Sequence, residues 1–345
     1  MAGDTAPIRS EERFDEERVA AHLRAALPEL GDAPIEFEQF PGGKANLTYI
    51  ARVGTREYAL RRPPLGPVAP GSHDMTREYR VLSVLHAAYP LAPEAYHLCT
   101  DEEVMGKPFF VMERRVGTVI RGEWPEELSD DAATRRTVAE SLVDALAALH
   151  GVDYEVLGLA DLGRPAGFAE RQVAGWTDRW HRARHEDVPA MDHLADGLAK
   201  SIPRPQRASL IHNDFKLDNT MVGPEGEIVA VFDWDMATIG DPLVDLGTTL
   251  AYWKGHVELA AVVAPDSAVL GDVMSESEMV DRYCAATGLD GSSLDWYLAL
   301  ASFRIAVIIQ QIYIRYVRGQ TSDERFALYG AVVPPIAASG LERLG

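Results

Sequence analysis

The order of hydrophobic patterns along the chain is the feature that most restricts its fold. Residues 1–115 contain short segments that alternate apolar and polar side chains, the pattern of half-buried strands. These segments are Ile35–Phe40, Leu47–Val53 and Glu57–Arg61, and two further segments, Ala95–Cys99 and Phe109–Glu113, also fit strands. Beyond residue 116 the apolar positions mostly recur at helical spacing. The sequence therefore predicts an α+β fold with two lobes: an antiparallel sheet plus helix in residues 1–115, and a mostly helical lobe in residues 116–345.

Capping residues and apolar spacing place the expected helices. Asp15 precedes an amphipathic helix that runs to Leu27, and Ser72 is expected to cap a helix that runs to Tyr89. In the second lobe, helices are expected over Ser129–His150, over Phe168–His185 and from Asp241 onward. Three short strands interrupt them, at Leu210–Ile211, Thr220–Val222 and Ile228–Phe232. The second lobe thus contains a small insert of strands and loops.

The net charge of the chain limits the classes of partner that it is expected to bind. It has 33 basic and 53 acidic residues, a net charge of −20, and that excess disfavours nucleic acid, which needs a basic surface. Residues 116–345 carry most of this negative charge, and we expect these acidic side chains to lie on a solvated surface. Cys99 and Cys284 form no close motif and are expected to be free thiols. Without an apolar segment at the N-terminus, or an unbroken one long enough to span a bilayer, we expect a cytoplasmic protein with no membrane partner.

The octamer from His212 to Asn219 carries the strongest chemical signal. It has the form H-x-D-x-x-x-x-N, the catalytic-loop pattern of protein kinases. Asp214 can accept or orient the proton of a hydroxyl nucleophile, and Asn219 supplies an oxygen ligand for Mg²⁺. The chain has only three asparagines, and two of them, Asn213 and Asn219, lie in this octamer. Such placement indicates a requirement for asparagine.

A second acidic motif follows one hairpin later. Asp233 ends the apolar segment Val231-Phe232 and occupies the place of the metal-binding aspartate of kinases, so it is predicted to bind Mg²⁺. Asp235, two residues further on, is a weaker candidate ligand. Upstream, Gly42-Gly43 lies between two expected strands and Asn46 follows it, which indicates a loop for nucleotide phosphates once the catalytic loop is considered.

The third strand has arginine where kinases place a phosphate-binding lysine. Either Arg61 or Arg62 takes that position, and Glu78 on the following helix is the expected partner. Arginine can also bind phosphate, but its side chain is longer and its planar group is not equivalent to an ammonium. Surface charge is the alternative explanation for either arginine.

Together these motifs resemble the aminoglycoside phosphotransferase-like branch of the protein-kinase-like superfamily. Within it the chain is similar to the kinase-like domain fused to acyl-CoA dehydrogenases in animals, and to its free-standing bacterial relatives. The resemblance covers nearly the whole chain, in the family's order: Pro41–Thr48, Tyr58–Pro64, Arg77–Leu85, Phe109–Arg114, Leu149–Asp153, Leu210–Val222 and Val231–Trp253. It implies a bilobal kinase-like fold and a phosphotransferase that uses ATP and Mg²⁺.

The resemblance also implies roles for individual residues. Asp214 would be the catalytic base, with Asn219 and Asp233 as Mg²⁺ ligands and Arg61 as the phosphate-binding residue beside Glu78. The adenine-binding hinge would comprise Val111, Met112, Glu113 and Arg114. Lys216 departs from the His or Arg common in the family, yet it can neutralise charge on the transferred phosphoryl group. Asp241 and Asp245 match the family's Asp-Pro-x-x-Asp segment and are interpreted as structural, with Asp241 capping a helix.

The sequence gives only weak indications of which molecule accepts the phosphoryl group. On the expected helix from Leu298 to Arg318, four polar residues fall on one stripe: Arg304, Gln311, Arg315 and Arg318. A solvated face is one explanation, and an anionic acceptor facing Arg304 is the other. Asp235, Trp253 and Arg304 are predicted to contact the acceptor.

We expect phosphorylation of a small-molecule hydroxyl, in a hydroxy acid or a hydroxyacyl thioester. The alternatives are an aminoglycoside or other amino alcohol as acceptor, a nucleotide-binding pseudokinase with a regulatory role, and a protein kinase. The last is weakened because no activation segment follows Asp233. A homodimer is left open.

Overall fold

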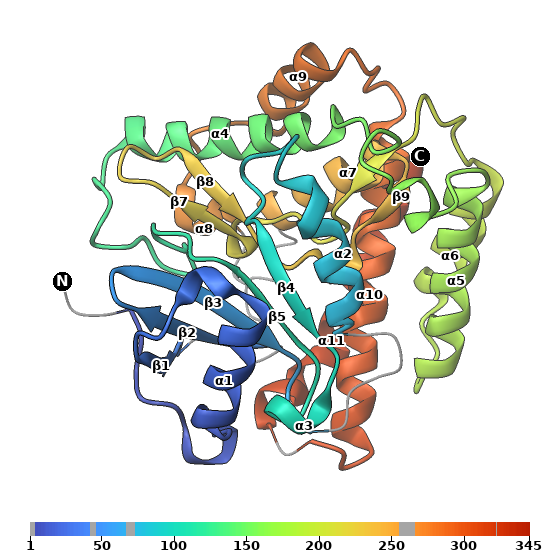
Figure 1. The fold of residues 1–345 in the computed structure, drawn as a ribbon. Coiled ribbons are helices and arrows are strands. Elements are labelled where there is room, and N and C mark those ends of the chain that lie inside the picture. The colour runs from blue at the N-terminus through green and yellow to red at the C-terminus, as the bar shows by residue number, and fades with distance from the viewer. Residues whose placement is uncertain (1–3, 42–45, 67–72, 255–265, 322) are drawn as a thin grey trace. The chain divides into compact units, whose positions relative to one another are not determined.

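The computed structural model describes residues 4–41, 46–66, 73–254, 266–321 and 323–345 (Figure 1). The chain forms two compact units, each built from two stretches of sequence. The first unit comprises Met1–Val116 and Val229–Ala237, and the second comprises Gly117–Ile228 and Thr238–Gly345. The sequence pattern assigns all of residues 116–345 to one lobe, whereas the structure places Val229–Ala237 in the first unit. The functional division of the lobes stays a prediction.

The first unit is built on a five-stranded antiparallel sheet in the order β1-β2-β3-β5-β4, coloured blue to cyan in Figure 1. Its strands are β1 (Ile35–Gln39), β2 (Leu47–Val53), β3 (Arg56–Arg62), β4 (Ala95–Cys99) and β5 (Phe109–Glu113). The predicted N-terminal sheet is confirmed. In the β2–β3 register Thr48 lies opposite Arg61 and Leu47 lies opposite Arg62. Because side chains alternate along a strand, Arg61 and Arg62 point to opposite faces of the sheet.

Three helices accompany this sheet: α1 (Glu16–Ala26), α2 (Met75–Leu85) and the short α3 (Glu102–Met105). Asp15 caps α1 as predicted, and α1 contributes Val19 and Leu23 to the core under the sheet. The predicted start of α2 is wrong. Its N-cap is Asp74, which accepts the backbone N–H groups of Thr76 and Arg77, while Ser72 lies outside the described residues. An Asp next to the first apolar turn is as good a cap as Ser, so composition alone could not choose between them.

The segment Val229–Ala237 completes the first unit. It holds most of β8 (Ile228–Val231) and the turn that follows this strand. The Val231 backbone N–H donates to the Leu91 carbonyl over 2.8 Å, and the Trp234 ring packs edge-on against Tyr89 at 6.0 Å between ring centroids. Asp233, predicted to bind metal, is therefore anchored among residues from the first third of the chain.

The second unit is mostly helical, as predicted. Its helices are α4 (Ala132–His150), α5 (Phe168–Ala183), α6 (Pro189–Lys200), α7 (Pro242–Lys254), α8 (Asp266–Leu270), α9 (Glu276–Thr287), α10 (Leu294–Val317) and α11 (Tyr329–Leu344). The helix α10 packs against α5, α6, α7 and α11. Its short strands are β6 (Ser209–Ile211), β7 (Thr220–Val222) and β9 (Thr238–Gly240). The helix α6 and the strand β9 were not predicted from the sequence. The strand β9 pairs antiparallel with β6. Because β9 precedes α7 and β6 precedes the catalytic loop, this pairing brings the starts of α7 and of the loop together.

Among the helices that the structure describes, α10 alone is long and apolar enough to cross a membrane by length and composition. In the apolar window of this helix, 78% of the residues are buried inside the protein, as in the core helix of a soluble fold. Length and composition are weak evidence for a membrane span when the helix is covered in this way.

Candidate active site

In the second unit, the backbone of the predicted catalytic loop is held by one buried carboxylate. Asp245, on α7, accepts the backbone N–H of His212 at 2.5 Å and that of Asn213 at 2.7 Å. Asn213 has a left-handed backbone, with φ of 69°, which turns the chain sharply at this point. Burial opposes the charge of Asp245, yet hydrogen bonds from His150 and His212 hold its pKa below the ordinary value. The predicted structural role of Asp245 is thus specific: it fixes the loop that presents Asp214.

Asp214 is fixed by its own loop. Lys216 Nζ lies 3.0 Å from Asp214 Oδ2, and Asn219 Nδ2 donates to the same oxygen at 2.9 Å and to the Asp214 carbonyl at 2.8 Å. The ammonium of Lys216 also lies 4.9 Å from the centre of the Tyr252 ring. The side chain of Asp214 is 23% exposed, so a substrate hydroxyl can reach an oriented carboxylate.

Charge in this cluster is balanced by these contacts. Burial opposes the charge of Lys216, but Asp214, Tyr252 and Asp218 together outweigh that effect and raise the pKa of the Lys216 ammonium. For Tyr252, burial and then the Asp214 charge raise the pKa of its hydroxyl, so it stays protonated. Lys216 is therefore a permanent cation beside the candidate base.

The amide oxygen of Asn219 is chemically suited to bind an Mg²⁺ ion. Because its Nδ2 donates to Asp214, the amide oxygen Oδ1 is directed away from Asp214. Within the described ranges, no group of three or more His, Cys, Asp or Glu side chains could hold a metal by itself. A site with few protein oxygens fits Mg²⁺, which takes one or two protein ligands plus phosphate oxygens and water. The amide of Asn219 and the carboxylate of Asp233 are of the required kind.

In the first unit, Arg61 joins two carboxylates. Its Nε lies 2.9 Å from Glu78 Oε2, and its terminal nitrogen forms an ion pair with Asp233. Glu78 Oε1 also accepts the backbone N–H of Trp234 at 3.3 Å. Glu78 is fully enclosed, and this burial raises the pKa of its carboxyl above the ordinary range even though Arg61 opposes the shift. A basic strand residue paired with a helix glutamate is the arrangement predicted from the sequence.

Arg62 has a different role. On the opposite face of the sheet its guanidinium donates to the Tyr49 hydroxyl, to the Met105 carbonyl at 2.5 Å and to the Glu12 carbonyl at 2.5 Å. This arginine is buried and ties three segments of the first unit together. The geometry therefore favours Arg61, rather than Arg62, as the residue in the position of the kinase lysine.

The remaining nucleotide-binding predictions fall on or beside the sheet. Gly42 and Gly43 lie outside the described residues, whereas Asn46 is described and buried. In the predicted hinge, Val111 and Met112 are buried within β5, and Glu113 ends that strand in an ion pair with Arg115. The Arg114 guanidinium lies 4.9 Å from the centre of the Phe40 ring. The nucleotide-binding roles of these residues stay predictions.

The three residues predicted to contact the acceptor do not come together within either unit. Asp235 belongs to the first unit, where burial and the neighbouring Asp233 charge raise the pKa of its carboxyl. Trp253 is fully buried in the second unit, and its indole N–H has no partner in the described part of the chain. Arg304 is also buried there. Their acceptor role stays a prediction.

The predicted polar stripe on α10 divides into two parts. Arg304 is only 5% exposed and donates to Thr248 Oγ1 at 3.3 Å and to the Asn213 carbonyl at 3.2 Å. It also lies 5.5 Å from the centre of the Trp176 ring. The other three stripe residues are exposed: Gln311, Arg315 and Arg318. The solvated-face explanation therefore fits that part only, because Arg304 holds the carbonyl of the residue before Asp214.

We expect Arg304→Met to lower kcat about tenfold, the effect of losing roughly one hydrogen bond to a charged donor. The reason is that the Asn213 carbonyl would lose its contact with the guanidinium, so Asp214 would be less well oriented. Steady-state kinetics at varied acceptor concentration would measure this decrease in kcat. Arg315→Met, an exposed substitution on the same helix, is the matched control. A raised acceptor KM at unchanged kcat would contradict this and support direct acceptor binding.

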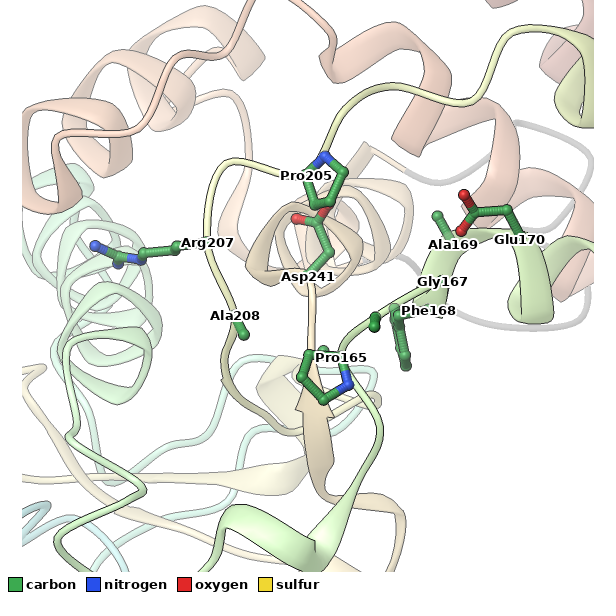
Figure 2. Close-up of a pocket in the computed structure, with 11 residues that line it drawn as sticks. Pro165, Gly167, Phe168, Ala169, Glu170, Pro205, Arg207, Ala208 and Asp241 are labelled. Carbon is green, nitrogen blue, oxygen red and sulfur yellow. The ribbon is translucent and has the colours of Figure 1, made fainter.

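A pocket of about 280 Å³ lies elsewhere in the second unit, at the start of α5. Pro165, Phe168, Glu170 and Asp241 are among its lining residues, and Figure 2 shows the Arg207 side chain directed away from the centre of the group. Asp241 caps α7 by accepting the Leu243 N–H at 3.0 Å, as predicted, and also accepts from the Tyr297 hydroxyl. None of the predicted site residues lines this pocket.

Sequence reasoning missed two residues beside the predicted ones. Tyr252 contacts Lys216, and the Asp214 charge raises the pKa of its buried hydroxyl, while His73 contacts Asn46. An aromatic residue on an apolar helix and a histidine just before a helix cap are both common, so neither carries a distinguishing signal. Tyr252 and His73 each contact a segment that is far away along the chain.

Comparison with known families shows which family the chain belongs to. The family model described as "Phosphotransferase enzyme family" matches residues 36–265, which is most of both predicted lobes and the whole catalytic loop. The chain belongs to the phosphotransferase enzyme family. It is 33% identical over 348 residues to human "Acyl-CoA dehydrogenase family member 11", covering 98% of this chain and 44% of that protein. Mouse "Acyl-CoA dehydrogenase family member 10" is 31% identical, over 93% of this chain and 30% of that protein. The chain thus spans less than half the length of these relatives.

Solved structures agree with the family's kinase-like fold. A Ralstonia eutropha protein described as a candidate aminoglycoside phosphotransferase matches with a TM-score of 0.81 and 33% identity, covering 96% of this chain and 98% of that one. A macrolide 2′-phosphotransferase of type I matches with a TM-score of 0.59 and 21% identity, over 90% and 95% of the two chains. The second likeness concerns the fold alone. The predicted resemblance and the α+β, kinase-like fold class are both confirmed.

Proposed function

We propose that this phosphotransferase is an ATP- and Mg²⁺-dependent kinase that phosphorylates a hydroxyl group of a small molecule. The observation that carries the proposal is the partly exposed Asp214 carboxylate, oriented by Lys216 and Asn219 on a loop that Asp245 holds. Membership of the phosphotransferase family supports it. The proposal has the protein acting in the cytoplasm, without a nucleic-acid or membrane partner.

In this proposal each residue has a defined task. Asp214 orients the acceptor hydroxyl and takes its proton as the new oxygen–phosphorus bond forms and ADP leaves. Lys216, a stable cation 3.0 Å from that carboxylate, offsets negative charge on the phosphoryl group. Arg61, held by Glu78, binds nucleotide phosphate. Mg²⁺, held by the oxygens of Asn219 and Asp233, would neutralise phosphate charge.

For the acceptor we propose a hydroxy acid or a hydroxyacyl thioester. The sequence relatives named as acyl-CoA dehydrogenase family members support this class, although this chain corresponds to less than half of each. The local charge also supports it: the cation Lys216 adjoins Asp214, and the charge of Arg304 also acts on Tyr252 in this cluster. Two cations would disfavour a polycationic aminoglycoside.

An aminoglycoside or other amino alcohol is the second candidate acceptor. The description of the Ralstonia eutropha structure favours it, since that structure is similar over nearly the whole chain. A regulatory pseudokinase is the third candidate function, and the observation that favours it is arginine in place of the usual lysine. Arg61 nevertheless keeps the pairing with Glu78 that the position requires.

A screen for ADP release tests these candidates. The wild-type chain would be incubated with ATP, Mg²⁺ and, in turn, hydroxy acids, hydroxyacyl-CoAs, aminoglycosides and amino alcohols. We expect release above the acceptor-free background with a hydroxy acid or hydroxyacyl-CoA, and none above it in Asp214→Asn. Release with amino alcohols alone would replace the proposed acceptor. No release with any acceptor, in a chain that still binds ATP, would favour the pseudokinase.

A further inference from the structure

An orphaned hydrogen-bond donor lies next to the predicted phosphate loop of the first unit. Asn46 is 4% exposed, and its Nδ2 has no hydrogen-bond partner among the residues that the structure describes. Its Oδ1 faces His73 Nδ1 at 2.9 Å. Buried amide donors are rarely left unsatisfied, because the group loses its hydrogen bonds to water. An acceptor from outside the protein would remove that cost.

His73 fixes which end of the Asn46 amide is free. If Nδ1 of His73 carries a hydrogen, it donates to Oδ1 of Asn46, and the NH₂ group of the amide must point the other way. His73 itself has a left-handed backbone with φ of 58°, a conformation that non-glycine residues seldom adopt. Burial and the Asp233 charge raise the pKa of the nearby Asp235 carboxyl, and the His73 backbone opposes that shift. The residue therefore keeps a costly conformation while its ring contacts Asn46.

The same contacts connect Asn46 with the basic centre of this unit. Asp235 lies close enough to Asp233, Arg61 and His73 for these groups to act on the pKa of its carboxyl. Asn46 also precedes β2 by one residue, two positions before Thr48, the cross-strand neighbour of Arg61. A free amide donor near a guanidinium matches the needs of a phosphate oxygen.

We propose that His73 is a positioning residue that turns the Asn46 amide so that Nδ2 donates to a phosphate oxygen of the bound nucleotide. This rests on the proposed function, since it requires a nucleotide in the first unit. His73 acts through Asn46 and does not touch the nucleotide itself.

Two substitutions of similar size separate donor from acceptor at this position. The His73→Asn change would place an N–H donor where Nδ1 of the imidazole lies, whereas His73→Asp would place an acceptor there; both new side chains tolerate a left-handed backbone. In His73→Asp the Asn46 amide is expected to turn over and donate Nδ2 to the new carboxylate. The nucleotide would then lose its donor.

Calorimetric titration with ADP and Mg²⁺, without acceptor, provides a readout that is independent of turnover. We expect Kd for ADP to rise about tenfold in His73→Asp and in Asn46→Ala, and to stay within about twofold in His73→Asn. His97→Asn is the matched control, because His97 lies in the same unit on β4 and pairs with His22. Thermal unfolding of each variant would verify that it is folded.

The double variant separates the proposed contact from simple charge repulsion. If His73→Asp acts through Asn46, it adds nothing to Kd in an Asn46→Ala background. A full tenfold effect in that background, or a single His73→Asp variant within twofold of wild type, would overturn the inference and leave the proposed kinase intact. A wild-type chain that binds no ADP would instead overturn the proposed function, and the inference with it.

Discussion

Asp214→Asn is expected to lower kcat by roughly 10²–10⁴-fold while ATP still binds. The substitution keeps the shape of the side chain but removes the charge that accepts the hydroxyl proton and pairs with Lys216. Binding should persist because the predicted phosphate-binding groups, Arg61 and Asn46, belong to the first unit. Single-turnover ADP release with the acceptor found by screening, together with calorimetric ATP binding, would measure both quantities.

Asp218→Asn is the matched control for this experiment. Asp218 lies in the same octamer, but its side chain is exposed, and the proposed mechanism gives it no task. The same change of charge at this position should leave the rate within about twofold, since exposed substitutions away from a site have small effects. Full activity in Asp214→Asn would refute the assigned role of Asp214.

The second large effect is expected on folding. Asp245→Asn should lower the free energy of unfolding by roughly 2–4 kcal/mol, because a buried carboxylate that accepts several hydrogen bonds is replaced by an amide. The amide has one acceptor oxygen, so one of the two loop N–H groups, from His212 or Asn213, would face an NH₂ group instead. Equilibrium denaturation would measure the loss, with a lower kcat expected because Asp214 follows Asn213 directly.

Asp218→Asn serves here as well, with an expected change in unfolding free energy within about 0.5 kcal/mol. Equal stability of Asp245→Asn and wild type would mean that the catalytic loop keeps its shape without this carboxylate. The interpretation of Asp245 as the residue that fixes the loop would then be wrong.

Much of the local structure was predictable because the relevant signals are local. The strands Ala95–Cys99 and Phe109–Glu113 were predicted to the residue, since their apolar residues end at clear turns. The closeness of Asp214 and Asn219 could also be expected, because only four residues of tight loop separate them. Such features depend on residues near one another in sequence.

Other contacts depend on segments that are distant in sequence. The strand β9 has three residues and no alternation, and it is defined only by its pairing with β6. The burial of Arg304 against the Asn213 carbonyl could not be read from a helical stripe, because the stripe shows a shared face and not what covers it. The contact of His73 with Asn46 likewise joins the region before α2 to the region before β2.

The composition of the first unit from two stretches of sequence has a consequence for synthesis on the ribosome. Glu78 is enclosed by contacts that include the Trp234 backbone, and Arg61 pairs with Asp233. Both partners are translated long after the sheet itself is complete. A nascent chain that ends at Val116 would therefore expose Tyr89, which would lack the Trp234 ring. Arg61 would lack its ion pair with Asp233, and Glu78 would lack its hydrogen bond from the Trp234 backbone. We expect the first unit to mature only after Ala237 has emerged, although domains usually fold in the order of their synthesis.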